Sequence, residues 1–142
     1  YNNQLTSLDV SQNTALDILD CYNNQLSTLD VSQNTALIYL NCYNNQLTSL
    51  DVRNGNNVNM NSPNFTSNYS LYCIDVDSAA YSTANWNNID SVMSFSNNCA
   101  VLFGCTDTLA CNYDSIAIIN DSSCVYTPSS SIDNVGAFCD GR

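Results

Sequence analysis

Hydrophobic and polar positions repeat at a fixed interval in the first part of the chain. The pentapeptide Tyr-Asn-Asn-Gln-Leu begins at residue 1 and recurs at residues 22 and 43. Each 21-residue repeat divides into two halves with the pattern Leu-x-x-Leu-x-(Val or Cys)-x-x-Asn. Within a half, the second Leu and the Val or Cys alternate with polar neighbours, as the inward positions of a short strand do. Fixed periods of about 20–50 residues are typical of stacked repeat folds.

The repeats therefore predict a mostly β fold with two short parallel strands in each repeat. Strands of successive repeats would stack about 4.8 Å apart. The first leucine of each half is expected in the core, and the closing asparagine is expected to bond turn backbone that would otherwise be unpaired. These positions are Leu5, Leu16, Leu26, Leu37 and Leu47, with Asn13, Asn24, Asn34 and Asn45.

The pattern L-x-x-L-x-L-x-x-N over residues 1 to about 58 resembles leucine-rich repeats. The likeness is to the short bacterial internalin-like type, whose repeats carry a cysteine in one strand. That resemblance implies a right-handed superhelical solenoid. Cys21 and Cys42 occupy the strand position that Val10 and Val31 fill in the other halves. We interpret them as inert buried thiols; a disulfide or metal pair is the alternative.

The period fails after Val52, and residues from about 53 to 100 are expected to cover the open end of the repeats. An alternating run over 71–77 predicts one more strand, and the spacing of apolar residues over 78–92 predicts a short helix or turn. The surroundings of Cys73, Trp86 and Cys99 resemble the C-terminal cap of leucine-rich-repeat proteins secreted by marine bacteria. This resemblance implies a Cys73–Cys99 disulfide. The alternative is that Cys73 continues the row of thiols.

Residues 101–127 form a separate cysteine-rich segment, and 128–142 a linker or the start of a following segment. The motifs Gly-Cys-Thr-Asp, Ala-Cys-Asn-Tyr and Asp-x-Ser-Cys resemble a small module of large secreted bacterial proteins. So short a segment cannot build a sufficient core, so cross-links or a metal are expected. Four cysteines allow three disulfide connectivities. Carboxylates here could hold Ca²⁺, although the spacing is not that of an EF-hand. The cysteines are Cys105, Cys111, Cys124 and Cys139, and the carboxylates are Asp107, Asp114 and Asp121.

Composition excludes several functions. The 142-residue chain has 13 acidic residues, all Asp, two arginines, and neither Lys nor His, for a net charge of −11. Nothing can neutralise phosphates, which argues against nucleic acid and anionic membranes. Without His, Glu or Lys, the chain lacks serine–histidine, cysteine–histidine and histidine–zinc chemistry, which argues against an enzyme.

Eight cysteines indicate a secreted or cell-surface location. No apolar run reaches the roughly 18 residues of a membrane span, so direct membrane insertion is not expected. Because residue 1 is already in register with the repeat, we expect a fragment of a longer protein.

Two outward faces remain after the core is assigned. One stacks Asp9, Asp30 and Asp51, and such like charges need compensation from a bound cation or from neighbouring polar groups. The other is the candidate binding face. Tyrosines bring large contact area at low entropic cost, which suits protein or carbohydrate recognition, although stacking of the tyrosines on each other explains them equally well. Its residues are Ile18, Asp20, Tyr22, Tyr39, Asn41 and Tyr43.

The sequence thus predicts a non-enzymatic recognition or adhesion module of a larger secreted or cell-surface bacterial protein. Its partner would be a protein or carbohydrate on a surface, and self-association is open. The alternative is a structural stalk or fibre segment. Ice binding is a weaker third hypothesis, because the outward residues vary and include Asp. No cofactor is predicted apart from the candidate Ca²⁺.

Overall fold

The computed structural model describes residues 1–126, which fall into two compact units. The first unit is Tyr1–Cys99, and the second begins at Ala100. Strands are short and helices are few among the described residues, and two disulfides are present. The prediction of a mostly β fold with disulfides is therefore confirmed. The expected linker at 128–142 lies outside the described residues.

One row of the first unit is built on β1 (Ile18–Asp20) and β3 (Tyr39–Asn41). They pair in parallel, with Ile18 opposite Tyr39 and Asp20 opposite Asn41, one repeat apart. Isolated bridges continue the row from Asn41 to Asn64 and on to Asn88. These later steps are longer than 21 residues, so the sequence period does not reveal them.

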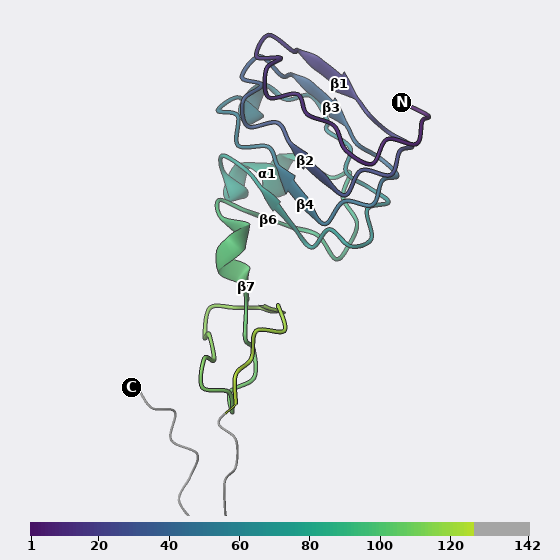
Figure 1. The fold of residues 1–142 in the computed structure, drawn as a ribbon. Coiled ribbons are helices and arrows are strands. Elements are labelled where there is room, and N and C mark those ends of the chain that lie inside the picture. Colours follow the sequence, from purple (N-terminus) through teal and green to yellow (C-terminus); the bar gives the residue numbers. More distant parts are fainter. Residues whose placement is uncertain (127–142) are drawn as a thin grey trace, which may run out of the picture. The chain divides into compact units, whose positions relative to one another are not determined.

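A second row contains four parallel strands: β2 (Thr28–Asp30), β4 (Ser49–Asp51), β5 (Cys73–Asp75) and β6 (Ser94–Ser96). Figure 1 shows β1 beside β3, and β2, β4 and β6 in the other row. The strand β5 and the helix α1 (Ala79–Asn85) confirm the elements predicted over 71–77 and 78–92. Residues 7–9, by contrast, form no strand. The second repeat has both predicted strands, β2 and β3.

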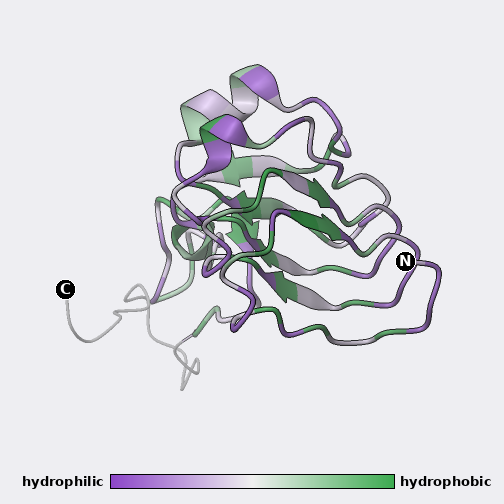
Figure 2. Ribbon diagram, turned by 90° about the horizontal axis from the view of Figure 1, so that it is seen from above, coloured by the Kyte–Doolittle hydropathy of each residue, from purple (hydrophilic) through white to green (hydrophobic). Residues whose placement is uncertain are grey.

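The repeat leucines form the core, with the valines and cysteines beside them. Leu26, Leu37 and Leu47 have no exposed surface, whereas Leu5 in the first repeat is 44% exposed. Figure 2 shows hydrophobic residues along the strands and hydrophilic residues in many of the connecting turns. The other fully covered side chains include Val31, Leu40, Cys42, Val52, Leu71, Ile74 and Val76.

Three buried asparagines tie successive repeats together, and we call them the asparagine ladder: Asn24, Asn45 and Asn68. Each side-chain carbonyl accepts a backbone N–H from the preceding repeat, at 3.2 Å from Leu5, 3.0 Å from Leu26 and 3.1 Å from Leu47 respectively. Each side-chain amide donates to a backbone carbonyl three residues earlier, at 2.9–3.0 Å. The ladder satisfies backbone groups at a turn where no strand partner exists.

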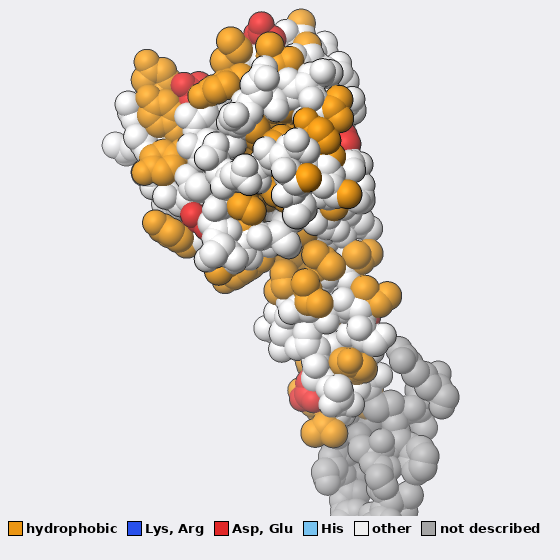
Figure 3. Space-filling view, turned by 180° about the vertical axis from the view of Figure 1, so that it is seen from behind, with side chains coloured by type: hydrophobic (Ala, Val, Ile, Leu, Met, Phe, Trp, Pro, Cys, Tyr) orange, Lys and Arg blue, Asp and Glu red, His pale blue; other side chains and the backbone are white. Residues whose placement is uncertain are grey.

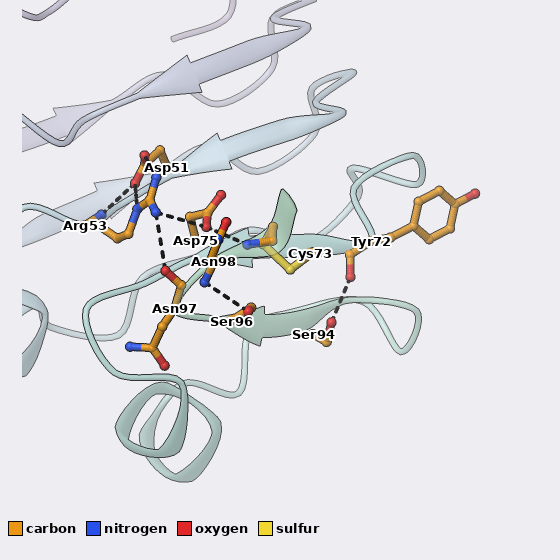
Figure 4. The surroundings of a disulfide bond; sticks show 10 residues. Asp51, Arg53, Tyr72, Cys73, Asp75, Ser94, Ser96, Asn97 and Asn98 are labelled. Atoms are coloured by element: carbon orange, nitrogen blue, oxygen red, sulfur yellow. Dashed lines mark hydrogen bonds and ion pairs between the residues drawn. A yellow bond between two sulfur atoms is a disulfide. The ribbon is translucent and has the colours of Figure 1, made fainter. Parts of the chain in front are cut away.

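Aromatic side chains and a disulfide close the far end of the first unit. Phe65, Trp86 and Phe95 meet edge to face, with ring centroids 5.7–6.4 Å apart. The disulfide joins Cys73 to Cys99, the pair that the cap resemblance implied (Figure 4). Helix α1 begins after Ser78, whose hydroxyl accepts the Tyr81 N–H at 3.3 Å, a standard N-cap contact. The short 3₁₀ segments η1 (Asn57–Asn59) and η2 (Cys99–Leu102) complete the connections.

The second unit is small and is cross-linked. Strands β7 (Phe103–Gly104) and β8 (Ile119–Asn120) pair in parallel, and a disulfide joins Cys105 to Cys124. A Cβ at Gly104 would lie 3.0 Å from the Cβ of Ala117, a tighter contact than most Cβ atoms make, so a larger residue would require Ala117 to shift.

Candidate binding face

The register of β1 and β3 places four of the six candidate residues in two cross-strand pairs, and Tyr22 and Tyr43 follow in the turns after the strands. Ile18 and Tyr39 are opposite each other and are 57% and 38% exposed. Tyr43 is 39% exposed, and its backbone carbonyl accepts the N–H of Asn23, which ties the turn after β3 to the turn after β1. We call these residues, together with Tyr1, the tyrosine face: Tyr1, Ile18, Asp20, Tyr22, Tyr39, Asn41 and Tyr43.

Tyr1 belongs to this face but is not among the candidates predicted from sequence. Its ring stacks on Tyr22 with centroids 4.9 Å apart and planes 4° from parallel. Its place in the 21-residue register was the signal that could have identified it. Each of these two rings covers one face of the other, and Tyr1 remains 63% exposed. Stacking of tyrosines on each other, the alternative to partner binding as an explanation for these residues, therefore does occur at this pair.

The surroundings of Tyr22 favour its neutral hydroxyl. The pKa of Tyr22 is raised, chiefly by desolvation and further by Tyr1, Asp20 and Tyr39. The Tyr22 phenol therefore stays protonated at neutral pH and can donate as well as accept a hydrogen bond. Asp20 adds a negative charge, and one of its carboxylate oxygens is covered without a hydrogen-bond partner.

An outer row of asparagines fixes the turns that carry the tyrosines. Asn2, Asn23 and Asn44 have positive φ values of 53°, 53° and 52°, a conformation that asparagine tolerates better than most residues. The side-chain amide of Asn23 donates to Asn2 at 2.7 Å, and that of Asn44 donates to Asn23 at 2.9 Å. Tyr1, Tyr22 and Tyr43 each directly precede one of these asparagines. The asparagine bonds therefore fix the backbone beside each tyrosine before any partner binds.

Contacts within the protein compensate the repulsion between the stacked carboxylates of Asp9, Asp30 and Asp51. Oδ1 of Asp9, Asp30 and Asp51 each accepts the backbone N–H two residues ahead, at 2.8–3.0 Å. The guanidinium of Arg53 also bonds Asp51, with Nε to Oδ1 at 2.9 Å, and lies 3.5 Å from Asp75 (Figure 4). Burial raises the pKa of Asp51, but the hydrogen bonds and charge of Arg53 outweigh it, so the pKa is lowered overall. The carboxylates therefore bond neighbouring backbone and Arg53, and these contacts supply the compensation expected from a cation or polar neighbours.

Each of the three candidate calcium ligands makes its own hydrogen bonds to nearby groups of the protein. Asp107 accepts the Tyr126 hydroxyl at 2.6 Å and the Leu109 N–H at 2.9 Å, and these bonds lower its pKa. Asp114 and Asp121 each accept a backbone N–H two residues ahead, at 2.9 Å. Within residues 1–126, no three acidic, cysteine or histidine side chains are grouped to hold a metal ion. The structure thus does not bring these aspartates together.

The remaining cysteine candidates all belong to the segment after Cys99. Cys105 pairs with Cys124. Cys111 is itself disulfide-bonded, and Cys139 lies outside the described residues. The disulfides indicate an oxidising, extracellular environment.

Cys21 and Cys42 remain free thiols in the core. Burial raises the pKa of Cys21 to about 11, helped by the charge of Asp20, and burial also raises the pKa of Cys42 well above its ordinary value. Their sulfurs lie 3.5 Å and 3.6 Å from the backbone oxygens of Asn41 and Asn64. These environments are those of unreactive thiols.

We expect both thiols to resist labelling in the folded protein. At pH 8 a group of pKa about 11 is roughly one-thousandth ionised, against about a quarter for an ordinary cysteine. Thiol labelling followed by mass spectrometry is expected to modify Cys21 and Cys42 only after denaturation. Because the folded pKa values are raised, the unfolded chain releases its protons first, so the free energy of unfolding should fall as pH rises above about 8.5. Fast labelling of Cys21 in the native protein would contradict this.

Comparisons with family models, curated proteins and solved structures found no match to this chain. Among residues 1–126, every helix is too short or too polar to span a bilayer. In the space-filling view of Figure 3, acidic side chains lie as separate groups among polar atoms, and hydrophobic groups are scattered between them.

Proposed function

We propose that the chain is a leucine-rich-repeat solenoid whose tyrosine face makes it a non-enzymatic recognition or adhesion module of a larger extracellular protein. The in-register pairs of 21-residue repeats support the solenoid, because strands one repeat apart lie side by side. The right-handed superhelix belongs to the same proposal. The buried asparagine ladder supports a rigid scaffold for an exposed face.

The observation that carries the recognition proposal is the exposure of tyrosines in a row whose backbone is already fixed. A fixed surface loses little conformational entropy on binding, and tyrosine contributes area and a hydroxyl together. The Tyr1–Tyr22 stack covers one face of each ring, and Tyr1 is still 63% exposed, so hydroxyls, ring edges and ring surface are all available to a partner.

Charge narrows the class of partner further. The chain has a net charge of −11, and the tyrosine face carries Asp20. A partner with basic groups around its contact surface would be attracted by this field, and the attraction would weaken with salt. The proposed partner is therefore a protein with a basic or neutral polar surface; carbohydrate is the second candidate.

The test is binding of the full chain to protein and glycan arrays, with wild type compared with the double variant Tyr22→Ala/Tyr43→Ala. Aromatic residues dominate interface energies, so we expect the double variant to bind about tenfold or more weakly. The matched control is Tyr69→Ala/Tyr72→Ala, which removes two exposed tyrosines outside the face. Equal loss in both variants would contradict the proposal.

The stalk or fibre segment remains the alternative, because the asparagine ladder would serve a spacer equally well. Absence of any specific binder to wild type in both arrays would favour it. Ice binding needs a regular outward surface. The row instead pairs Ile18 with Tyr39 and Asp20 with Asn41, which are unlike side chains. Thermal hysteresis measurements test this third hypothesis.

A further inference from the structure

A pocket at the closed end of the first unit is unrelated to the tyrosine face. Its cavity volume is about 350 Å³, near the small end of the range of about 300–1,000 Å³ for ligand pockets. It is bounded by the end of α1, the segment after it, and β6. Its walls are Thr83, Trp86, Asn87, Ile89, Met93, Ser94 and Phe95.

The pocket combines an apolar floor with a polar margin. Trp86 is 3% exposed and packs edge to face against Phe95, so both rings are fixed. Thr83 and Asn87 are exposed, and within residues 1–126 neither side chain makes a hydrogen bond to the protein. Ser94 donates its hydroxyl to the Tyr72 carbonyl at 3.1 Å, which leaves its oxygen able to accept. The margin therefore offers both donors and acceptors to a ligand.

None of the walls is charged, although the chain as a whole is strongly acidic. An ionic ligand would find no counter-charge here, whereas a neutral one needs none. The indole Nε1 of Trp86 is covered and has no hydrogen-bond partner in the protein. Because that atom is covered, we assign recognition of hydroxyl groups to Thr83, Asn87 and Ser94.

We propose that this pocket binds a single neutral sugar ring. A pyranose has an apolar face of C–H groups and a rim of hydroxyls, which matches a pocket whose partly exposed apolar walls, Ile89 and Phe95, lie beside amide and hydroxyl groups. An apolar side chain from a partner protein fits less well. It would cover the free amide of Asn87 and the hydroxyl of Thr83 without bonding them, and leaving such groups unpaired is unfavourable.

Trp86 is the only tryptophan of the chain, so its fluorescence reports this pocket alone. The full chain is titrated with methyl glucoside, methyl galactoside, methyl mannoside and N-acetylglucosamine. Glucuronate and cyclohexanol serve as the charged and the apolar six-membered controls. We expect a saturable fluorescence change with at least one neutral sugar, and weaker or no binding of both controls. Binding of none of the sugars, or tighter binding of cyclohexanol, would overturn the proposal.

Variants of exposed wall residues locate the site. Asn87→Ala and Thr83→Val each remove hydrogen-bonding capacity without touching the core, and each is expected to weaken sugar binding about threefold to tenfold. Tyr22→Ala/Tyr43→Ala is expected to leave it unchanged, so this proposal and the tyrosine-face proposal fail independently. Sugar binding that survives both wall variants but is lost with the tyrosines would place the site elsewhere and overturn this inference.

Discussion

Asn45→Ala is expected to lower the free energy of unfolding by about 3–5 kcal/mol. The side chain is buried and bonds the N–H of Leu26 and the carbonyls of Cys21 and Cys42 at 3.0–3.1 Å, with a longer bond of 3.5 Å to the Tyr43 carbonyl. Alanine would leave the Leu26 N–H without its partner in the interior, which costs about 1–3 kcal/mol. It would also remove one of the two bonds to each carbonyl, since Asn24 and Asn68 still donate to Cys21 and Cys42, and each lost bond costs about 1 kcal/mol. The expected loss is a large share of the roughly 5–15 kcal/mol typical of a whole protein.

The repeat supplies a matched control for this experiment. Asn3 occupies the same position in the first repeat, but it is exposed and its side chain bonds only the Tyr1 carbonyl, at 2.9 Å. Asn3→Ala is therefore expected to cost less than about 1 kcal/mol. Urea unfolding followed by circular dichroism measures both. Similar losses for Asn3→Ala and Asn45→Ala would mean that the residue type, and not its buried bonding, carries the effect.

Removing the Cys73–Cys99 disulfide with a Cys73→Ala/Cys99→Ala double substitution is expected to destabilise the first unit by about 3–4 kcal/mol. The two cysteines are 26 residues apart, so the bond closes a loop that contains α1 and Trp86. In the unfolded chain this closed loop has fewer conformations, and opening it favours unfolding. The bond also holds the ends of the segment that packs Phe65, Trp86 and Phe95 together.

Trp86 fluorescence during urea unfolding measures this effect, because the residue reports only the closed end of the first unit. The control is Cys105→Ala/Cys124→Ala, which removes a disulfide of similar span, 19 residues, from the second unit. We expect the control to leave the stability reported by Trp86 within about 0.5 kcal/mol of wild type. A midpoint unchanged by loss of the Cys73–Cys99 bond would show that packing alone closes the unit.

The candidate face was predictable from sequence to the extent that it follows the period. Ile18 and Tyr39 lie one repeat apart at the same outward position of paired strands, so the repeat alone is enough to infer that they are neighbours. Tyr1 shares that register, yet only the structure shows its ring stacked on Tyr22. The pocket at Trp86 could not be inferred, because its walls come from a segment without a repeat.

The sequence by itself determined the core positions, the parallel pairing of the repeats and the burial of Cys21 and Cys42. These depend on a local alternation of polar and apolar residues that recurs unchanged, so one repeat predicts the next. Tertiary structure alone decided the rest. Asn68 joins the asparagine ladder although it lies off the 21-residue period, since backbone hydrogen bonds depend on distance in space. Arg53 compensates Asp51 and Asp75 because β4 and β5 pair across residues that no sequence spacing relates.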